Sequence, residues 1–476
     1  MGTQKKRKIY YAFNTTEDVA ENARSKIHSR YFKLKKMNQE IANDDDSEDD
    51  NGIVIDDKLP FDYISDYIPK NIISNLSRGT NMKIKDNQSK GYLADVDDTT
   101  IKRFLVDDTT IKRFLGVNLM MSVIKYPQLE MYWTGTTKVS GIADSMSLDK
   151  FRNIIRHLQF DYSSEKNHDK SDDKFLKFRP LLDSIQMRCK QLKRPKRVAV
   201  AMMVMSFENG FEKIEIMKKN TNVYGALVIL VLIAPDGRLL DIEFYQSYDK
   251  LIEAVKNTKL DISDYDDLSM GEAAVLRFIK SVHPGTMFFF GEEFTTLRLL
   301  DILNKHNMGG TGIIAKKNIP NTVKCNSDKN LDLSVIENGN HCIVSWQSLS
   351  LASNVFEVKK PIYEPHTPIY EHYTPHTHNG KNVLTQKHKQ SIPNIVYKYN
   401  SFMIGVDIFH KLFDHDNSSF STGKYDVDLI LTLINMAYIN SWSECRIGYP
   451  RCEGSGVMAM KFFKSNIIDS YMAKTN

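Results

Sequence analysis

The sequence has few cysteines, and none of them are paired at metal-binding spacing. Its five cysteines, Cys189, Cys325, Cys342, Cys445 and Cys452, are scattered over 476 residues without a CxxC pair. An odd number of widely separated cysteines argues against a disulfide framework and favours reduced thiols in a cytosolic or nuclear compartment. A disulfide-stabilised secreted domain is therefore not expected.

Long apolar runs and a strong charge of one sign are also missing. The longest apolar stretches, such as residues 226–234, are far shorter than a membrane span. The lysines near the N-terminus are not followed by an apolar region, as they would be in a signal peptide. The net charge of +5 is mild and neither establishes nor excludes nucleic-acid binding. We expect no secretion and no membrane insertion.

The apolar content is sufficient for a large core. At 41% hydrophobic residues, the chain is expected to form two or three domains. Residues 1–60 are predicted to be a disordered leader, with a basic run at residues 5–8 and an acidic run at 41–57. The basic run is typical of a nuclear import signal, although a solvated tail has the same composition. A nuclear location is the prediction.

Residues 61–195 have a helical pattern, and the pattern changes near residue 197. One helix is expected to stop at Pro127, and another to begin after Ser147 as its N-cap. From residue 197, apolar strand-like runs alternate with helical segments, which is typical of an α/β sheet. We predict core segments at 196–319 and 391–445, an insertion at 320–390 and a tail at 446–476.

The predicted insertion combines a β-type stretch with a Pro/His/Tyr-rich segment. The histidines of that segment lack a strict ligand spacing, so a polar loop is favoured over a metal site. They are His366, His372, His376 and His378.

Seven segments in order resemble the piggyBac transposases and the domesticated proteins derived from them. They read "FLGVNLMMSVIKYPQLEMYW", "MSLDKFRNIIRHLQFD", "KFRPLLDSI", "FGEEFTTLRLLDIL", "GTGIIAKKNIP", "YNSFMIGVDIFHKL" and "NMAYINSW". The resemblance implies an α/β fold: an RNase H-like catalytic-type core with an inserted β-rich subdomain. An all-helical N-terminal domain of the dimerisation and DNA-binding type is expected before the core.

The resemblance also implies metal-dependent DNA transposition, in which three carboxylates hold divalent cations such as Mg²⁺. Matched to the family motifs, the first two acid positions carry Ala201 and Gly291, and the third is retained as Asp407. The frequent acidic neighbour of the third acid is His410 here. We therefore expect a degenerate triad and no metal ligand set.

Two other acids are candidate substitutes for the lost ones. Glu292 follows the lost second position directly, and Glu208 lies near the end of the first core strand. A shift of one residue along a strand turns a side chain to the opposite face, so Glu292 would need a local bulge. Glu208 would need a turn of the chain to bring its carboxylate back to the position of Ala201. Asp407 is expected near the start of a helix, where it could persist as a cap.

The prediction is a nuclear, piggyBac-derived protein that binds DNA or chromatin without cutting DNA. Alternatives are an active transposase or nuclease using Glu292 and Asp407 with Mg²⁺, a decaying element copy without selected function, and a scaffold that binds no DNA. Apart from Mg²⁺ in the enzyme alternative, no cofactor is expected. The sequence allows a homodimer but does not predict one. The two cysteines of the tail are too few for the family's zinc-binding domain.

A basic stretch at residues 188–197 is the candidate for contacts to DNA phosphates. A solvated linker between a helix and a strand would have the same composition. The predicted DNA-binding residues are Lys190, Lys193, Arg194, Lys196 and Arg197.

Residues 96–115, "VDDTTIKRFLVDDTTIKRFL", are one ten-residue block written twice. In a continuous helix, ten residues rotate the following face by about −80°, so both copies cannot present the same side chains to one core. We predict a break at Val106–Asp108, with Asp107, Asp108 or Thr109 capping the second segment. The second copy leads directly into the family-like helix, and the first copy is expected to pack loosely.

Overall fold

The computed structural model divides the chain into two compact units. Unit 1 contains Met1–Lys193, Met202–Lys250 and Asp407–Asn476, and unit 2 contains Arg194–Ala201 and Leu251–Val406. The residues described are 9–11, 58–90, 98–161, 173–206, 214–215, 222–223, 226–319, 326–328, 333–338, 341–346, 349–356, 370–372, 375–378, 381–384, 388–390, 393–416, 422–448 and 460–473. The division into six segments predicted from the sequence stays a prediction.

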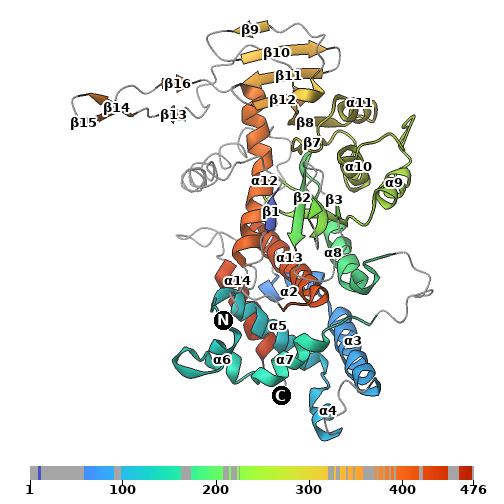
Figure 1. The fold of residues 1–476 in the computed structure, drawn as a ribbon, viewed down its shortest axis with the longest axis vertical. Coiled ribbons are helices and arrows are strands. Elements are labelled where there is room, and N and C mark those ends of the chain that lie inside the picture. Colours follow the sequence, from blue (N-terminus) through green and yellow to red (C-terminus); the bar gives the residue numbers. More distant parts are fainter. Residues whose placement is uncertain are drawn as a thin grey trace. The chain divides into compact units, whose positions relative to one another are not determined.

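Unit 1 is mainly helical. Its helices are α2 (Pro60–Tyr67), α3 (Lys70–Ser89), α4 (Asp98–Phe104), α5 (Asp108–Val123), α6 (Ser140–Ala143), α7 (Leu148–His157), α8 (Arg179–Gln191), α13 (Tyr425–Gly448) and α14 (Met460–Met472) (Figure 1). Short 3₁₀ turns occur at η1 (Leu129–Tyr132), η2 (Gly135–Thr137) and η4 (Leu176–Phe178). The predicted cap is confirmed, because the Ser147 side chain accepts a hydrogen bond from the Lys150 backbone N–H.

The duplicated block forms two separate helices, as predicted. Helix α4 ends at Phe104 and α5 begins at Asp108, with Asp107 as the N-cap that accepts from Thr110 N–H at 2.7 Å. Asn81 of α3 holds the break: its Oδ1 accepts from Val106 N–H at 2.8 Å, and its Nδ2 donates to Val106 O at 2.7 Å. The Lys150 ammonium donates to the carbonyls that end α4, including Leu105 O at 2.7 Å.

The last helix of unit 1 packs against α5 and α2. Gly116 of α5 lies so close to α14 that a Cβ built there would be 3.2 Å from the Tyr471 Cβ. The buried Lys464 ammonium donates to the Ser122 hydroxyl at 2.8 Å. Helices far apart in the sequence therefore share one core.

The strands of unit 1 follow the order β6–β5–β2. Strand β5 (Ala226–Ile233) pairs antiparallel with β6 (Leu239–Phe244), and both are almost completely buried. Strand β2 (Arg197–Ser206) is shared, because its second half belongs to unit 1. A two-stranded sheet of β3 (Ile214–Glu215) and β4 (Asn222–Val223) is separate.

Part of the predicted disordered leader is ordered. Strand β1 (Ile9–Tyr11) pairs antiparallel with β2, with Tyr10 opposite Val204. These three residues pair with β2, and the disordered leader as a whole stays a prediction. The basic run at residues 5–8 and the acidic run at 41–57 lie outside the described residues.

Unit 2 is built on parallel strands. The first half of β2 pairs in parallel with β7 (Met287–Phe290), and β7 pairs in parallel with β8 (Gly309–Ile313). The connecting helices are α9 (Tyr248–Lys256, which begins in unit 1), α10 (Met270–Arg277), the 3₁₀ turn η5 (Phe278–Ser281) and α11 (Leu297–Lys305). Together with unit 1, this establishes the predicted mixed α/β architecture.

An antiparallel extension continues the sheet of unit 2 beyond β8. Its strands follow the order β12 (Leu349–Ser353), β11 (His341–Trp346), β10 (Leu333–Asn338) and β9 (Asn326–Asp328). The 3₁₀ turn η6 (Lys316–Asn318) comes between β8 and β9 along the chain. This agrees with the β-type stretch predicted for the insertion.

The Pro/His/Tyr-rich segment is not only loop. Strands β13 (Tyr370–His372), β14 (Pro375–His378), β15 (Lys381–Leu384) and β16 (His388–Gln390) pair as β13–β16 and β14–β15. Backbone pairing therefore overrides the turn-like composition at these positions. His366 lies outside the described residues.

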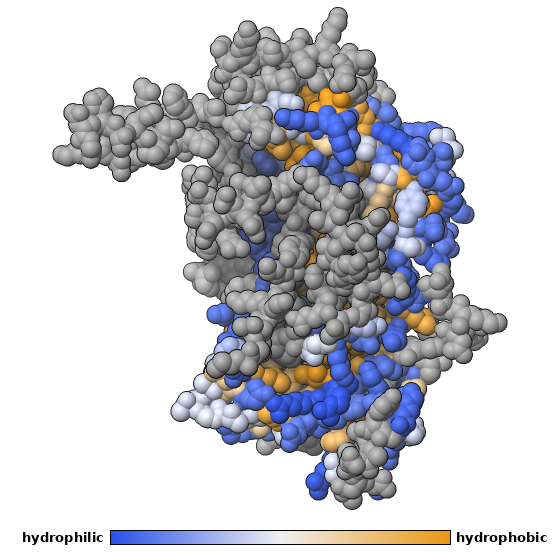
Figure 2. Space-filling model, viewed as in Figure 1, coloured by the Kyte–Doolittle hydropathy of each residue, from blue (hydrophilic) through white to orange (hydrophobic). Residues whose placement is uncertain are grey.

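Helix α12 (Asn394–Asp416) follows the insertion, and its first half belongs to unit 2. There the Phe402 ring packs against Phe289 of β7, with 4.8 Å between ring centroids. Across the described part of the chain, no helix is both long enough and apolar enough to span a membrane. Hydrophilic residues cover much of the visible face where Figure 1 labels α5, α6 and α7 (Figure 2).

Candidate functional site

Two of the three positions matched to family acids lie side by side in unit 2. The parallel pairing of β2 with β7 places Val200 opposite Phe290. Ala201 directly follows Val200, and Gly291 directly follows Phe290. Neighbouring strands lie about 4.8 Å apart, so these two positions face the same small region at the end of β7. The structure thus brings together a methyl group and a glycine.

The chain turns immediately after β7. Phe294 N–H and the Thr295 hydroxyl both donate to Gly291 O, at 3.2 Å and 2.8 Å. Tyr399 of α12 donates its hydroxyl to Phe290 O at 3.2 Å. The backbone around Gly291 is therefore held by hydrogen bonds from two segments.

Glu293 occupies the space beside Gly291 that a side chain at position 291 would take. A Cβ built on Gly291 would lie 2.7 Å from Glu293 Oε2 and 3.0 Å from its Cδ. The sequence favoured Glu292 as the substitute acid because it is adjacent to the lost position. Adjacency alone did not point to Glu293, whose carboxylate the turn after β7 brings beside Gly291.

Asp407 is not at the start of a helix. Helix α12 begins at Asn394, so Asp407 lies in its interior and is exposed. The predicted capping role is therefore wrong, because interior backbone N–H groups are bonded within the helix. Asp407 also belongs to unit 1, whereas Ala201 and Gly291 belong to unit 2.

His410 follows Asp407 by one helical turn and is buried. Burial lowers the pKa of His410 to about 4, so its imidazole is neutral at pH 7. A neutral, buried imidazole does not replace the hard oxygen ligand that a carboxylate would supply to Mg²⁺.

Ala201 of β2 and the residues directly after β7 do not fit a divalent cation. Ala201 offers no oxygen, Gly291 offers only backbone, and Glu293 is a single carboxylate. Among the described residues, no group of three or more His, Cys, Asp or Glu side chains is arranged to hold a metal ion. Glu208 lies outside the described residues.

The five predicted DNA-binding residues are divided between the two units. Lys190 and Lys193 are exposed in unit 1, at and after the end of α8. In unit 2, Lys196 is exposed and Arg194 is half-buried. The Arg197 guanidinium lies 4.6 Å from the centroid of the Phe402 ring, in a cation–π contact. Arg197 is therefore already used in packing.

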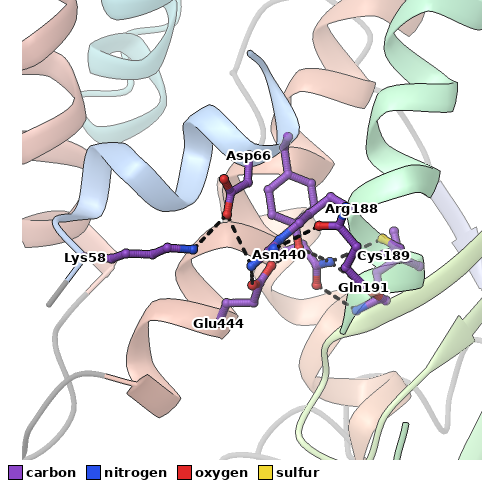
Figure 3. A network of polar contacts seen from close by, with 9 residues as sticks. Lys58, Asp66, Arg188, Cys189, Gln191, Asn440 and Glu444 are labelled. Carbon is purple, nitrogen blue, oxygen red and sulfur yellow. Dashed lines mark hydrogen bonds and ion pairs between the residues drawn. The ribbon is translucent and has the colours of Figure 1, made fainter. Parts of the chain in front are cut away.

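The basic stretch begins with a residue of a buried polar network in unit 1 (Figure 3). Arg188 of α8 bonds to Glu444 of α13 at 2.5 Å and to Asp66 of α2 at 3.3 Å. Lys58 also pairs with Asp66, at 3.2 Å. Arg188 therefore joins three helices and supplies the counter-charge for the buried Glu444 carboxylate.

The centre of this network is Asn440 of α13. Its amide donates to Tyr67 Oη at 2.8 Å and to Leu239 O at 2.9 Å, while its Oδ1 accepts from Leu239 N–H at 2.7 Å. Burial, together with the charges of Cys189 and Glu444, raises the pKa of Tyr67 well above its ordinary value. Tyr67 stays protonated and donates to Glu444. The network joins α2, α8, α13 and strand β6.

The comparisons with known proteins define the class. A family model described as Transposase IS4 matches residues 60–442, which is most of the chain. The chain belongs to this transposase family.

Among its relatives are two human proteins, and their names confirm the resemblance predicted from the seven motifs. The chain is 25% identical over 350 residues to PiggyBac transposable element-derived protein 3 of Homo sapiens, covering 69% of this chain and 53% of that protein. It matches the Chimeric ERCC6-PGBD3 protein of Homo sapiens at the same identity, covering 69% of this chain and 30% of that protein. The chain thus spans about half, or less, of the length of these relatives.

A solved structure has the same fold. It is a piggyBac transposase in a synaptic complex with hairpin DNA, with a TM-score of 0.66, 19% sequence identity, and coverage of 87% of this chain and 80% of that one. At this identity the likeness establishes the fold alone.

Proposed function

We propose that this chain is a piggyBac transposase-derived protein that binds DNA or chromatin in the nucleus without cutting DNA. The observation that carries the proposal is the position of Ala201 and Gly291, which directly follow the paired residues Val200 and Phe290 of the parallel strands β2 and β7. Cleavage by two metal ions needs carboxylates at such strand ends. Here the two positions supply a methyl group and a hydrogen atom.

We also propose that the sheet is an RNase H-like core. The strand order β6–β5–β2–β7–β8, with β5 and β6 antiparallel and β2, β7 and β8 parallel, supports this. In this arrangement β2 is the central strand, and Ala201 lies on it. The antiparallel strands β9–β12 would then be the inserted subdomain.

The alternative of an active enzyme has one specific observation in its favour, which is the Glu293 carboxylate beside Gly291. With Asp407 and Glu292 it could contribute to a rearranged acid set that binds Mg²⁺. A decaying element copy without selected function would have the same geometry, and no specific observation favours this further alternative.

A cleavage assay tests the central claim. The full chain is incubated with supercoiled plasmid and with hairpin-ended duplex DNA, in Mg²⁺ and in Mn²⁺, beside Asp407→Asn, Glu292→Gln and Glu293→Gln. We expect no nicking or strand transfer by the wild type above the level of the variants. Cleavage that is abolished by Asp407→Asn would contradict the proposal, and loss in Glu292→Gln or Glu293→Gln would identify the substitute acid.

DNA binding and location need separate measurements. We expect binding to labelled duplex DNA at low salt, with an affinity that falls as salt rises, because basic residues displace counterions from phosphates. A flat binding curve at low salt would favour the scaffold without DNA binding. Imaging a tagged full chain tests the nuclear location, and exclusion from the nucleus would contradict it.

A further inference from the structure

Helix α3 lies closely along the chain that leaves α7. Asn75 of α3 exchanges two hydrogen bonds with the Asp161 backbone, at 2.8 Å and 2.9 Å. One turn later, a Cβ built on Gly79 would lie only 2.2–2.4 Å from backbone atoms of residues 159–161. Residues four apart share a helix face, so Lys83 follows Gly79 on the face that meets the end of α7.

The start of α13 reaches the same place. The Lys424 ammonium, one residue before α13, donates to Arg156 O at 3.1 Å. Asp426 of α13 forms a long ion pair with Lys177 of η4, at 3.9 Å. Four segments of unit 1 that are far apart in the sequence therefore meet at the C-terminal end of α7.

These contacts gather four cationic side chains around one carboxylate. We call Lys83, Arg156, Lys177 and Lys424 the α7-end cluster, and the carboxylate is that of Asp426. Arg156, Lys177 and Lys424 are exposed, and Lys83 is half-buried. Within the described residues, the Lys83 ammonium has no hydrogen bond or ion pair. The cluster is thus accessible and has an excess of positive charge.

The positive charges of the cluster repel one another. Burial, followed by the charges of Lys424 and Lys177, lowers the pKa of Lys83, and only Asp426 opposes this. Burial and the charge of Arg156 likewise lower the pKa of Lys424. A fold does not gain stability from such crowding, since the charged form of each lysine is disfavoured.

A buried histidine lies beneath the cluster. His157 is 0% exposed, and its Nδ1 lies 3.0 Å from Asn153 O. Its Nε2 is buried and has no hydrogen-bond partner in the described part of the chain. Burial lowers the pKa of His157, and the charges of Arg156, Lys424 and Lys83 lower it further. The imidazole is neutral at pH 7 and does not offset the positive charge.

We infer that the α7-end cluster binds a backbone phosphate of a nucleic acid. The inference rests on the proposed function and assigns a phosphate site that differs from the basic stretch at residues 188–197. A phosphate would neutralise the repulsion among the four cations, and exposed lysine and arginine are the usual partners of phosphate oxygens. Because only the backbone is contacted, the site discriminates little between DNA sequences.

A purely structural role explains only part of the cluster. Cations at a helix C-terminus interact favourably with the helix dipole, which accounts for Lys424 on the Arg156 carbonyl. It does not account for Lys83, which approaches from α3 and has no partner among the described residues. Lys83 and Arg156 are therefore the informative pair to change, and Lys424 is left intact.

The test compares two double variants of the full chain. Lys83→Gln/Arg156→Gln removes two charges from the cluster. The control, Lys90→Gln/Lys138→Gln, removes two exposed lysines of unit 1 that are paired with Asp86 and Asp144. Binding to two unrelated labelled duplexes is followed by fluorescence anisotropy between 50 and 200 mM NaCl, and Tm is measured for each protein.

We expect the cluster variant to bind both duplexes about tenfold more weakly, with a salt slope smaller by about 1 to 2, while the control binds like wild type. The Tm of the cluster variant should equal that of wild type or rise, because repulsion among the cations of the cluster is relieved. Equal binding by wild type and cluster variant overturns the site but not the proposed function. A wild type that binds neither duplex at 50 mM NaCl overturns both.

Discussion

The two copies of the duplicated block share one sequence and differ in what surrounds them. In the second copy, Phe114 and Leu115 are 0% and 1% exposed. The equivalent Phe104 and Leu105 of the first copy are only half-buried. The Phe114 ring packs on Phe151, with 5.2 Å between centroids. Identical residues therefore contribute differently to the core.

The residues that follow each copy determine how long its helix is and how well it packs. The second copy continues into an apolar segment that completes the 16 residues of α5 and packs on α3 and α14. The first copy is followed by Val106 and Asp107, and its helix ends after seven residues. Propensity is the same in both, so tertiary packing makes the difference.

The largest expected effect comes from the paired phenylalanines. Phe114→Ala should lower the free energy of unfolding by about 3–5 kcal/mol, because it removes a fully buried ring. Phe104→Ala should cost about 1 kcal/mol, since that side chain is only partly buried. Urea denaturation of both variants measures the gap, and equal losses would mean that the copies are packed alike.

The second expected effect concerns Asn81, which holds the break between the copies. Asn81→Ala should cost about 2 kcal/mol, because the Val106 N–H loses its partner in a part-buried position. Hydrogen exchange at Val106 should become faster. Asn87→Ala, at a half-buried position near the end of α3, is the control and should have little effect. Unchanged exchange at Val106 would argue that the break does not depend on Asn81.

The third effect is the loss of the cap of the second copy. Asp107→Ala should destabilise the protein by about 1 kcal/mol, whereas Asp107→Asn should retain most of the stability, because both Asp and Asn cap well. Thermal unfolding gives the comparison. If Asp107→Ala matched wild type, the start of α5 would be fixed by packing alone.

The smallest effect is the pH dependence of this cap. The hydrogen bond from the Thr110 hydroxyl is the main reason that the pKa of Asp107 is below its ordinary value. A carboxylate with a lowered folded pKa stabilises the fold above its unfolded pKa, near 3.9, and this contribution is lost as pH falls through the folded pKa. The difference between wild type and Asp107→Ala should therefore be constant above about pH 5 and shrink below about pH 4. A difference that persisted at pH 2 would contradict the role of the charge.

Local features were predictable from the sequence. The break between the copies followed from helix rotation, and the caps at Asp107 and Ser147 followed from residue type. The apolar runs from residue 197 predicted the buried strands. These features depend on neighbours within a few residues, where sequence patterns are informative.

Long-range contacts were not predictable. Asn81 meets Val106 across 25 residues, and Arg188 meets Glu444 across 256. At the candidate site, adjacency to Gly291 suggested Glu292, but the turn after β7 places the Glu293 carboxylate beside Gly291. Asp407 was expected at a helix start, but α12 begins earlier, at Asn394 directly after Pro393.

The packing of α14 on α5 has a consequence for synthesis on the ribosome. Gly116 contacts Tyr471, and Ser122 accepts from Lys464, so α5 cannot bury this face until residue 472 has been made. Unit 2 is complete once Val406 has left the exit tunnel. During translation the face of α5 that packs on α14 therefore lacks its native partner while about 350 further residues are made.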